Sequence, residues 1–126
     1  GNDNLTGGAG SDVFLFNSAL GTTAAPNIDT ITDFTSGDDK ISLAKAIFGS
    51  IAGVAVNPMA ANEFIATTTA AFAGLNNTSG QHIIYNQTTG ALYYDATSGT
   101  TTDTVQIALI GATTHPVLSA ADFSIV

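Results

Sequence analysis

The 126-residue chain contains no cysteine, and no apolar run reaches the length of a membrane span. Without thiols it can form neither a disulfide framework nor a thiolate metal site. A membrane-spanning helix needs about 18 or more apolar residues in succession, so we expect no membrane span. No basic segment followed by an apolar stretch opens the chain, so no cleavable signal peptide is predicted there. We interpret the chain as a fragment whose N-terminal neighbours are missing.

Positive charge is scarce. Two Lys and Arg residues together face ten Asp and Glu residues, which gives a net charge of −8 at pH 7. Such a surface repels phosphate groups, so we expect no binding to nucleic acid or to anionic membrane surfaces. The charge suits a cationic partner instead, and a divalent metal ion is the plainest candidate.

Catalytic signatures are lacking as well. The His-Glu-x-x-His motif of zinc proteases does not occur, His82 and His115 are isolated, and the lone Glu63 adjoins neither. No Gly-x-Ser-x-Gly nucleophile turn occurs either. We therefore predict that the chain is not an enzyme. A hydrolase site assembled from distant residues and a sugar-binding platform made of the three tyrosines are weaker alternatives.

The pattern of apolar residues and turn formers predicts mostly β-structure. Strands are expected at residues 13–16 (buried), within 28–43 on both sides of a turn at 35–38, and at 82–86, 91–95, 104–110 and 123–126. Gly90 lies where the turn of the predicted hairpin needs a positive φ. Ser119, followed three residues later by Asp122, matches a helix-starting capping box. The Ala-rich segments 44–48 and 62–73 are ambiguous and each could form a short helix.

An internal repeat occupies residues 1–15. The segment Gly7–Leu15 reads Gly-Gly-Ala-Gly-Ser-Asp-Val-Phe-Leu and follows an incomplete copy that begins at Gly1. Its pattern, Gly-Gly-x-Gly-x-Asp-x-U-x with U apolar, is a calcium-binding nonapeptide repeat. A dinucleotide fingerprint fails because Val13 stands where its third glycine should be, and a phosphate loop fails for want of Gly-Lys-Ser/Thr.

Calcium chemistry accounts for this spacing. Ca²⁺ takes six to eight oxygen ligands at about 2.3–2.6 Å. Glycines let the turn bend so that carbonyl oxygens point inward, Asp12 adds charge, and the apolar residue two positions later points into a core. Each nonapeptide thus supplies one metal half-site and one short strand, and stacked half-sites should lie about 18 residues apart.

This periodicity selects further candidate ligands. The position stacked on Asp12 falls near residue 30, where Asp29-Thr30-Ile31 repeats the Asp-x-apolar element. We predict one calcium site between the turns of Asp12 and Asp29, whereas Asp3 would need an upstream turn to complete a second. The competing interpretation is a glycine-rich loop with solvated carboxylates. The full set of predicted metal ligands is Asp3, Gly8, Gly10, Asp12, Asp29, Asp33 and Asp39.

Taken together, these motifs resemble the last repeats and following segment of repeat-in-toxin proteins, especially the serralysin-type C-terminal domain. The matching segments are Gly7–Leu15, Asp29–Leu43, Ile83–Asn86, Gly90–Asp95 and Leu118–Phe123. The likeness spans nearly the whole chain and is weakest at 44–75. Many relatives carry Asp-x-Asp-Gly after the tyrosine pair, whereas this chain has Asp95-Ala96-Thr97-Ser98, so no second metal site is expected there.

The resemblance implies that the last turns of a calcium-bound parallel β-roll continue into antiparallel strands. Together with the residue pattern, this predicts a mainly β fold with one or two short helices. It divides the chain into the end of the roll, 1–43, and an antiparallel C-terminal cap, 44–126. It also implies a secreted bacterial protein whose uncleaved C-terminal signal is read by a type I secretion apparatus. Asp122 followed by apolar residues up to Val126 fits that signal. The implied partners are calcium, the upstream β-roll and the secretion apparatus.

The predicted function is therefore a folding and export module. In a cytosol poor in calcium the clustered carboxylates repel each other, and outside the cell calcium meets sites with an expected Kd of about 10⁻⁴–10⁻³ M. The alternative is a self-associating adhesin or surface-layer module, in which the open edge at residues 1–6 joins copies at the cell surface. Calcium-dependent oligomers would favour the alternative.

Overall fold

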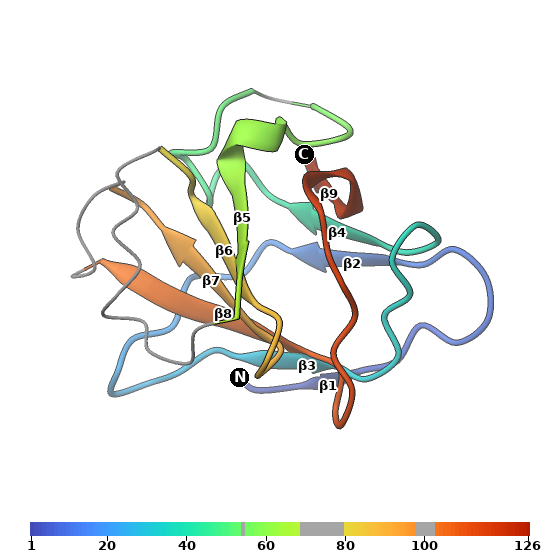
Figure 1. Cartoon of the computed structure of the whole chain (residues 1–126). Coiled ribbons are helices and arrows are strands. Elements are labelled where there is room, and N and C mark those ends of the chain that lie inside the picture. Colours follow the sequence, from blue (N-terminus) through green and yellow to red (C-terminus); the bar gives the residue numbers. More distant parts are fainter. Residues whose placement is uncertain (54, 69–79, 98–102) are drawn as a thin grey trace.

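Two β-sheets enclose the core of the molecule. The computed structural model describes residues 1–53, 55–68, 80–97 and 103–126. Within them one sheet runs β1-β3-β8-β7-β6-β5 and the other runs β2-β4-β9 (Figure 1). The strands are β1 (Asn4–Leu5), β2 (Val13–Phe16), β3 (Asp29–Ile31), β4 (Lys40–Leu43), β5 (Phe64–Thr67), β6 (Ile83–Asn86), β7 (Ala91–Asp95), β8 (Thr104–Ile110) and β9 (Phe123–Ile125).

The first four strands alternate between the two sheets. β1 pairs with β3 in the larger sheet, β2 pairs with β4 in the smaller one, and both pairings are parallel. Their alternate apolar side chains point inward, so that Phe14 lies beside Ile41 in the register of β2 and β4. This arrangement is two circuits of a parallel β-roll, and the predicted mainly β fold is confirmed.

One circuit of the roll is longer than the sequence suggested. Asp3 and Asp29 are bonded across 26 residues, and Asp12 and Asp39 across 27. The predicted spacing of about 18 residues is therefore wrong. The extra length lies in the connection 17–28 between β2 and β3, which contains the loop around Pro26 and lacks the glycine pattern of the first turn.

The larger sheet is completed by the predicted hairpin. β6 and β7 are antiparallel, and Gly90 in their turn has a φ of 77°. β8 pairs antiparallel with β7 and parallel with β3, while β5 adds a parallel edge strand to β6. The strand predicted at 104–110 is confirmed with its bounds unchanged.

The C-terminal strand extends the roll itself. β9 pairs with β4 in parallel, and Ile41 lies opposite Phe123 as it lies opposite Phe14 on its other side. The three-stranded sheet is therefore wholly parallel, whereas antiparallel pairing is found among β6, β7 and β8. Both sheets combine strands from the two predicted segments, 1–43 and 44–126.

Among the residues that the structure describes, helical structure is limited to single turns. Residues 44–48 form a turn instead of the predicted helix. Ile47 and Phe48 N–H both bond to Ala44 O, and the next bond, from Ile51 N–H to Phe48 O, closes a separate turn and does not continue a helix. Of the predicted helix at 62–73, Ala61–Glu63 form a 3-10 turn and Phe64–Thr67 are strand β5; residues 69–73 lie outside the described part. An isolated helical turn contributes little stability, because few hydrogen bonds offset the cost of ordering its backbone. Pairing with β6 instead gives the backbone N–H and C=O groups of β5 hydrogen-bond partners. None of the described helices is long and apolar enough to cross a membrane.

The core lies between the two sheets and includes residues from both predicted segments, 1–43 and 44–126. Its fully buried members include Ile31, Ile41, Leu43, Ile83, Tyr85, Leu92, Ile110, Phe123 and Ile125. β2 departs from its prediction as a buried strand. Phe14 is buried, but Val13 and Leu15 are 65% and 52% exposed, because β2 is an edge strand whose second face is open.

Candidate metal centre

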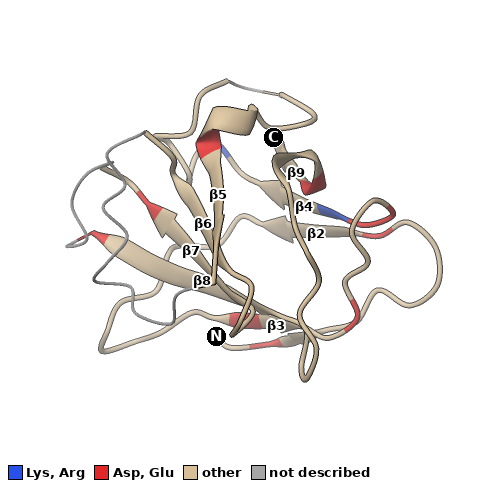
Figure 2. Ribbon diagram, in the orientation of Figure 1, with Lys and Arg blue, Asp and Glu red and all other residues tan. Residues whose placement is uncertain are grey.

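The turn that leads into β2 carries the Gly/Asp motif. Gly8 and Gly10 have φ values of 95° and 117°, which residues with side chains rarely adopt, so the two glycines permit its curvature. Acidic segments gather at the loops before β2, β4 and β9 (Figure 2). At the end of the first of these loops, the Oδ2 atom of Asp12 is buried and has no hydrogen-bond partner.

Gly7 fixes where that carboxylate lies. A Cβ atom added to Gly7 would come within 2.5 Å of Asp12 Oδ2 and 2.8 Å of its Cγ. Both distances are shorter than real Cβ contacts, so the Asp12 carboxylate packs directly over the backbone of Gly7. The first glycine of the motif is thus required by space, and Gly8 and Gly10 by backbone conformation.

Asp33, in the next circuit of the roll, binds the backbone of the same turn. Its Oδ1 accepts the N–H of Gly7 at 3.0 Å and its Oδ2 accepts the N–H of Gly8 at 2.8 Å. These two backbone hydrogen bonds lower the pKa of Asp33, because they stabilise the charged form. Asp12 and Asp33 therefore both border Gly7, and two negative charges meet at one turn.

Asp29 and Asp39 hold the backbone of the preceding circuit. Asp29 accepts the N–H of Asp3 at 3.0 Å, and the buried Asp39 accepts the N–H of Asp12 at 3.0 Å through Oδ1. The other oxygen of Asp39 accepts the N–H of Thr35 at 2.8 Å. The structure thus brings Asp12 together with Asp33 and Asp39 at one turn and Asp3 with Asp29 at another, whereas the predicted stacking of Asp12 on Asp29 is not found.

The donor atoms suit a hard cation. A buried carboxylate oxygen without a partner is costly unless a cation or a hydrogen-bond donor satisfies it. In the described part of the chain no three His, Cys, Asp or Glu side chains form a cluster that could hold a metal. A calcium ion here would therefore need backbone carbonyl oxygens of the glycine turn beside the carboxylates, and Ca²⁺ accepts such ligands. On this test Asp12 and its turn fit the ion.

Asp122 has a structural partner that the sequence did not reveal. Its buried carboxylate accepts the hydroxyl of Ser36 at 2.9 Å and the N–H of Gly37 at 3.1 Å through Oδ1, and the N–H of Ser119 at 2.8 Å through Oδ2. The capping box predicted from Ser119 and Asp122 is confirmed. The contact with Ser36 and Gly37 spans about two-thirds of the chain and left no signal in the local sequence.

A second acidic contact joins residues that are distant in the sequence. Glu63 adjoins neither histidine in the chain, but its Oε2 lies within hydrogen-bonding distance of His82 Nδ1, and its Oε1 accepts the N–H of Ala52 at 2.9 Å. The parallel pairing of β5 and β6 places Glu63 and His82 side by side, just before their strands. The buried Glu63 thereby ties the segment around Ala52 to the larger sheet.

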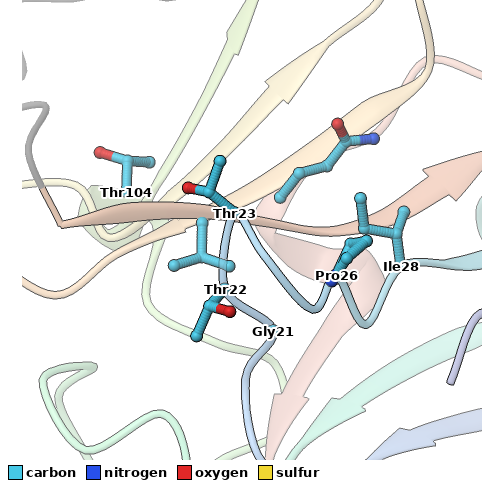
Figure 3. A pocket seen from close by; sticks show the side chains of 8 residues that line it. Gly21, Thr22, Thr23, Pro26, Ile28 and Thr104 are labelled. Carbon is cyan, nitrogen blue, oxygen red and sulfur yellow. The ribbon is translucent and has the colours of Figure 1, made fainter.

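A cavity of about 290 Å³ lies between the connection 17–28 and the start of β8 (Figure 3). It is lined by Gly21, Thr22, Thr23, Pro26, Ile28, Thr104, Val105 and Gln106. None of these lining residues is titratable or a strong nucleophile, so the cavity offers no general acid or base. Hydroxyl, amide and apolar groups give it no charge with which to hold a metal.

The parallel pairing of the strands and the Gly/Asp turn define the class of protein. It is a domain that forms the end of a Gly/Asp-type parallel β-roll, with β9 as the last strand of the smaller sheet. The chain belongs to the serralysin C-terminal family, since the model described as Peptidase M10 serralysin C terminal matches residues 1–123. That family is the non-catalytic C-terminal domain of serralysin metalloproteases, which are secreted repeat-in-toxin proteins. Comparison with curated proteins and with solved structures gave no match.

Proposed function

We propose that the chain is a calcium-binding folding module that couples extracellular calcium to the closure of a β-roll. The observation that carries this proposal is the buried, unpartnered Oδ2 of Asp12 beside Gly7. Asp12 would be the principal charged ligand, with Asp33 and the carbonyl oxygens of Gly8 and Gly10 completing the site. Bound calcium would neutralise the charge at the turn.

The remaining predicted ligands divide by position. Asp3 and Asp29 lie at the β1 and β3 side of the roll, and we propose that they contribute to a site completed by an upstream turn. The position of β1 and β2 supports this proposal. Each is an edge strand of its sheet, and an edge strand offers backbone groups with which an upstream strand could pair. Asp39 remains a predicted ligand; like Asp33, it already accepts one backbone N–H group with each of its oxygens.

Binding of calcium to the folded state alone would stabilise that state by mass action. One site at a tenfold excess of calcium over its Kd contributes roughly 1.4 kcal/mol. A net charge of −8 opposes compaction when no cation is bound, which favours an open chain where calcium is scarce. This difference is what passage through a type I apparatus requires, and we propose that the C-terminal residues Asp122 to Val126 form the signal it reads.

The test is a calcium titration of the chain followed by circular dichroism and by the thermal unfolding midpoint. Wild type should gain stability with calcium and lose it on chelation, whereas Asp12→Ala should respond weakly or not at all. Asp103→Ala serves as the control, because it removes the same charge outside the roll. Equal responses of wild type and Asp12→Ala would contradict the assignment of this site.

Self-association is a second candidate function, and the exposed Val13 and Leu15 favour it. Both lie on the edge strand β2, where a second copy could pair. Light scattering with and without calcium separates the two functions. Calcium-dependent oligomers that disappear in Leu15→Lys support assembly, whereas a monomer in both conditions supports the closing end of a roll.

A further inference from the structure

Two buried carboxylates, those of Asp39 and Asp122, connect the backbone of the metal turn to the C-terminal strand. Asp12 lies at the first turn, Asp39 at the second and Asp122 before β9. Asp39 and Asp122 are 2% and 1% exposed, and each carboxylate accepts hydrogen bonds both from its own turn and from a segment distant in the chain. Such buried charges persist only while their donors stay in place.

The first step joins the two turns of the roll. The N–H of Asp12 donates to Asp39, so the backbone position of the metal turn depends on the turn that follows one circuit later. The second oxygen of Asp39 accepts the N–H of Thr35, which opens that later turn. Asp39 therefore holds both turns with one side chain.

The second step joins the later turn to the C-terminus. Ser36 and Gly37 stand inside the turn between Thr35 and Asp39, and both donate to Asp122. Asp122 in turn caps the 3-10 turn that leads directly into β9, and β9 pairs with β4. The turn Thr35–Asp39 is thus closed by the bond between its first and last residues, and its middle is bonded to Asp122.

We propose that Asp39 and Asp122 are positioning residues that couple metal binding at Asp12 to the docking of the C-terminal strand. The inference rests on the proposed calcium function and adds its regulation. Calcium bound by Asp12 would hold the Asp12 N–H in position to donate to Asp39. Asp39 then keeps the turn Thr35–Asp39 ordered, and in that turn Ser36 and Gly37 are placed to donate to Asp122. Because such coupling is reciprocal, loss of the Asp122 contacts must weaken calcium binding at a turn that Asp122 does not belong to.

The experiment measures two quantities for each variant, the calcium Kd and the hydrogen exchange of the Ile125 and Val126 amides. These amides bond to Val56 and Leu43 only when β9 is docked. In wild type, calcium should slow their exchange. Asp122→Asn and Ser36→Ala should raise the calcium Kd about fivefold or more and reduce the slowing. Ser36→Ala removes only a surface hydroxyl, so it stays informative if Asp122→Asn fails to fold.

Asp38→Asn is the matched control. It removes the same charge from the exposed neighbour of Asp39, and it should bind calcium as wild type does. If Asp122→Asn and Ser36→Ala bind calcium as tightly as Asp38→Asn while Asp12→Ala does not bind, the coupling is refuted and the calcium function stands. If wild type itself does not bind calcium, both proposals fall.

Discussion

Gly7 illustrates how a single residue governs the candidate metal turn. Its φ lies outside the left-handed region, so the backbone would accept alanine, but a Cβ atom would collide with Asp12 Oδ2. The three glycines of the motif thus have different roles. Gly8 and Gly10 permit the bend, whereas Gly7 leaves room for the carboxylate.

Gly7→Ala should therefore impair calcium binding more than folding. The methyl group displaces the Asp12 carboxylate, and displaced ligands of this kind typically lose affinity by about tenfold or more. Calorimetric titration with calcium measures the loss. Gly49→Ala is the control, because its Cβ atom meets nothing closer than 3.9 Å. Equal affinities for the two variants would show that the carboxylate position does not matter.

At the scale of elements, the pairing of β4 with β9 decides how the chain ends. The sequence predicted a strand at residues 123–126 but not its partner. In the structure β9 pairs with β4 in parallel and is the third strand of the smaller sheet. Between the two strands Ser42 Oγ and Ser124 Oγ form a buried hydrogen bond of 2.7 Å. Two polar residues in buried strands thus satisfy each other.

Replacing one of these serines should cost more than replacing both. Ser42→Ala leaves the Ser124 hydroxyl buried without its partner, which destabilises by about 1–3 kcal/mol, and Ser124→Ala does the converse. The double variant removes both polar groups and should recover part of the loss. Urea unfolding of the four proteins measures this coupling. Strictly additive effects would mean that the two hydroxyls do not interact.

At the scale of the whole molecule, Tyr85 links the larger sheet to the C-terminal stretch. Its ring is fully buried in the core, and its hydroxyl donates to Pro116 O at 2.8 Å. Burial raises the pKa of Tyr85 to about 12, because the phenolate would lose its hydration. It also raises the pKa of Tyr93. The core is thus sensitive to alkali.

The sign of this dependence follows from the raised pKa. The unfolded chain ionises near the ordinary value of 10.0, so the stabilisation is complete below that pH and is lost as the pH rises through about 12. Tyr85→Phe should be less stable near neutrality by about 1 kcal/mol, for want of the hydrogen bond. Its further loss of stability in alkali should be smaller than that of wild type. Unfolding free energies with tyrosinate absorbance test this, and parallel alkaline curves would contradict it.

The sequence by itself determined the local elements. The hairpin around Gly90, strand β8, the capping box of Ser119 and Asp122, and the Gly/Asp turn were all predictable, because each depends on residues close in the chain. The class of fold followed from the same patterns. The predicted helix at 62–73 shows the limit of this reasoning, since strand pairing overrode the helical propensity of residues 64–67.

Only the tertiary structure decided which of these elements lie together. The long connection 17–28 changed the period of the roll, so Asp12 lies beside Asp39 and not beside Asp29. The contacts of Asp122 with Ser36 and of Glu63 with His82 arise from strand pairings between distant segments. Register across a sheet depends on connection length and core packing throughout the molecule, and local sequence encodes neither.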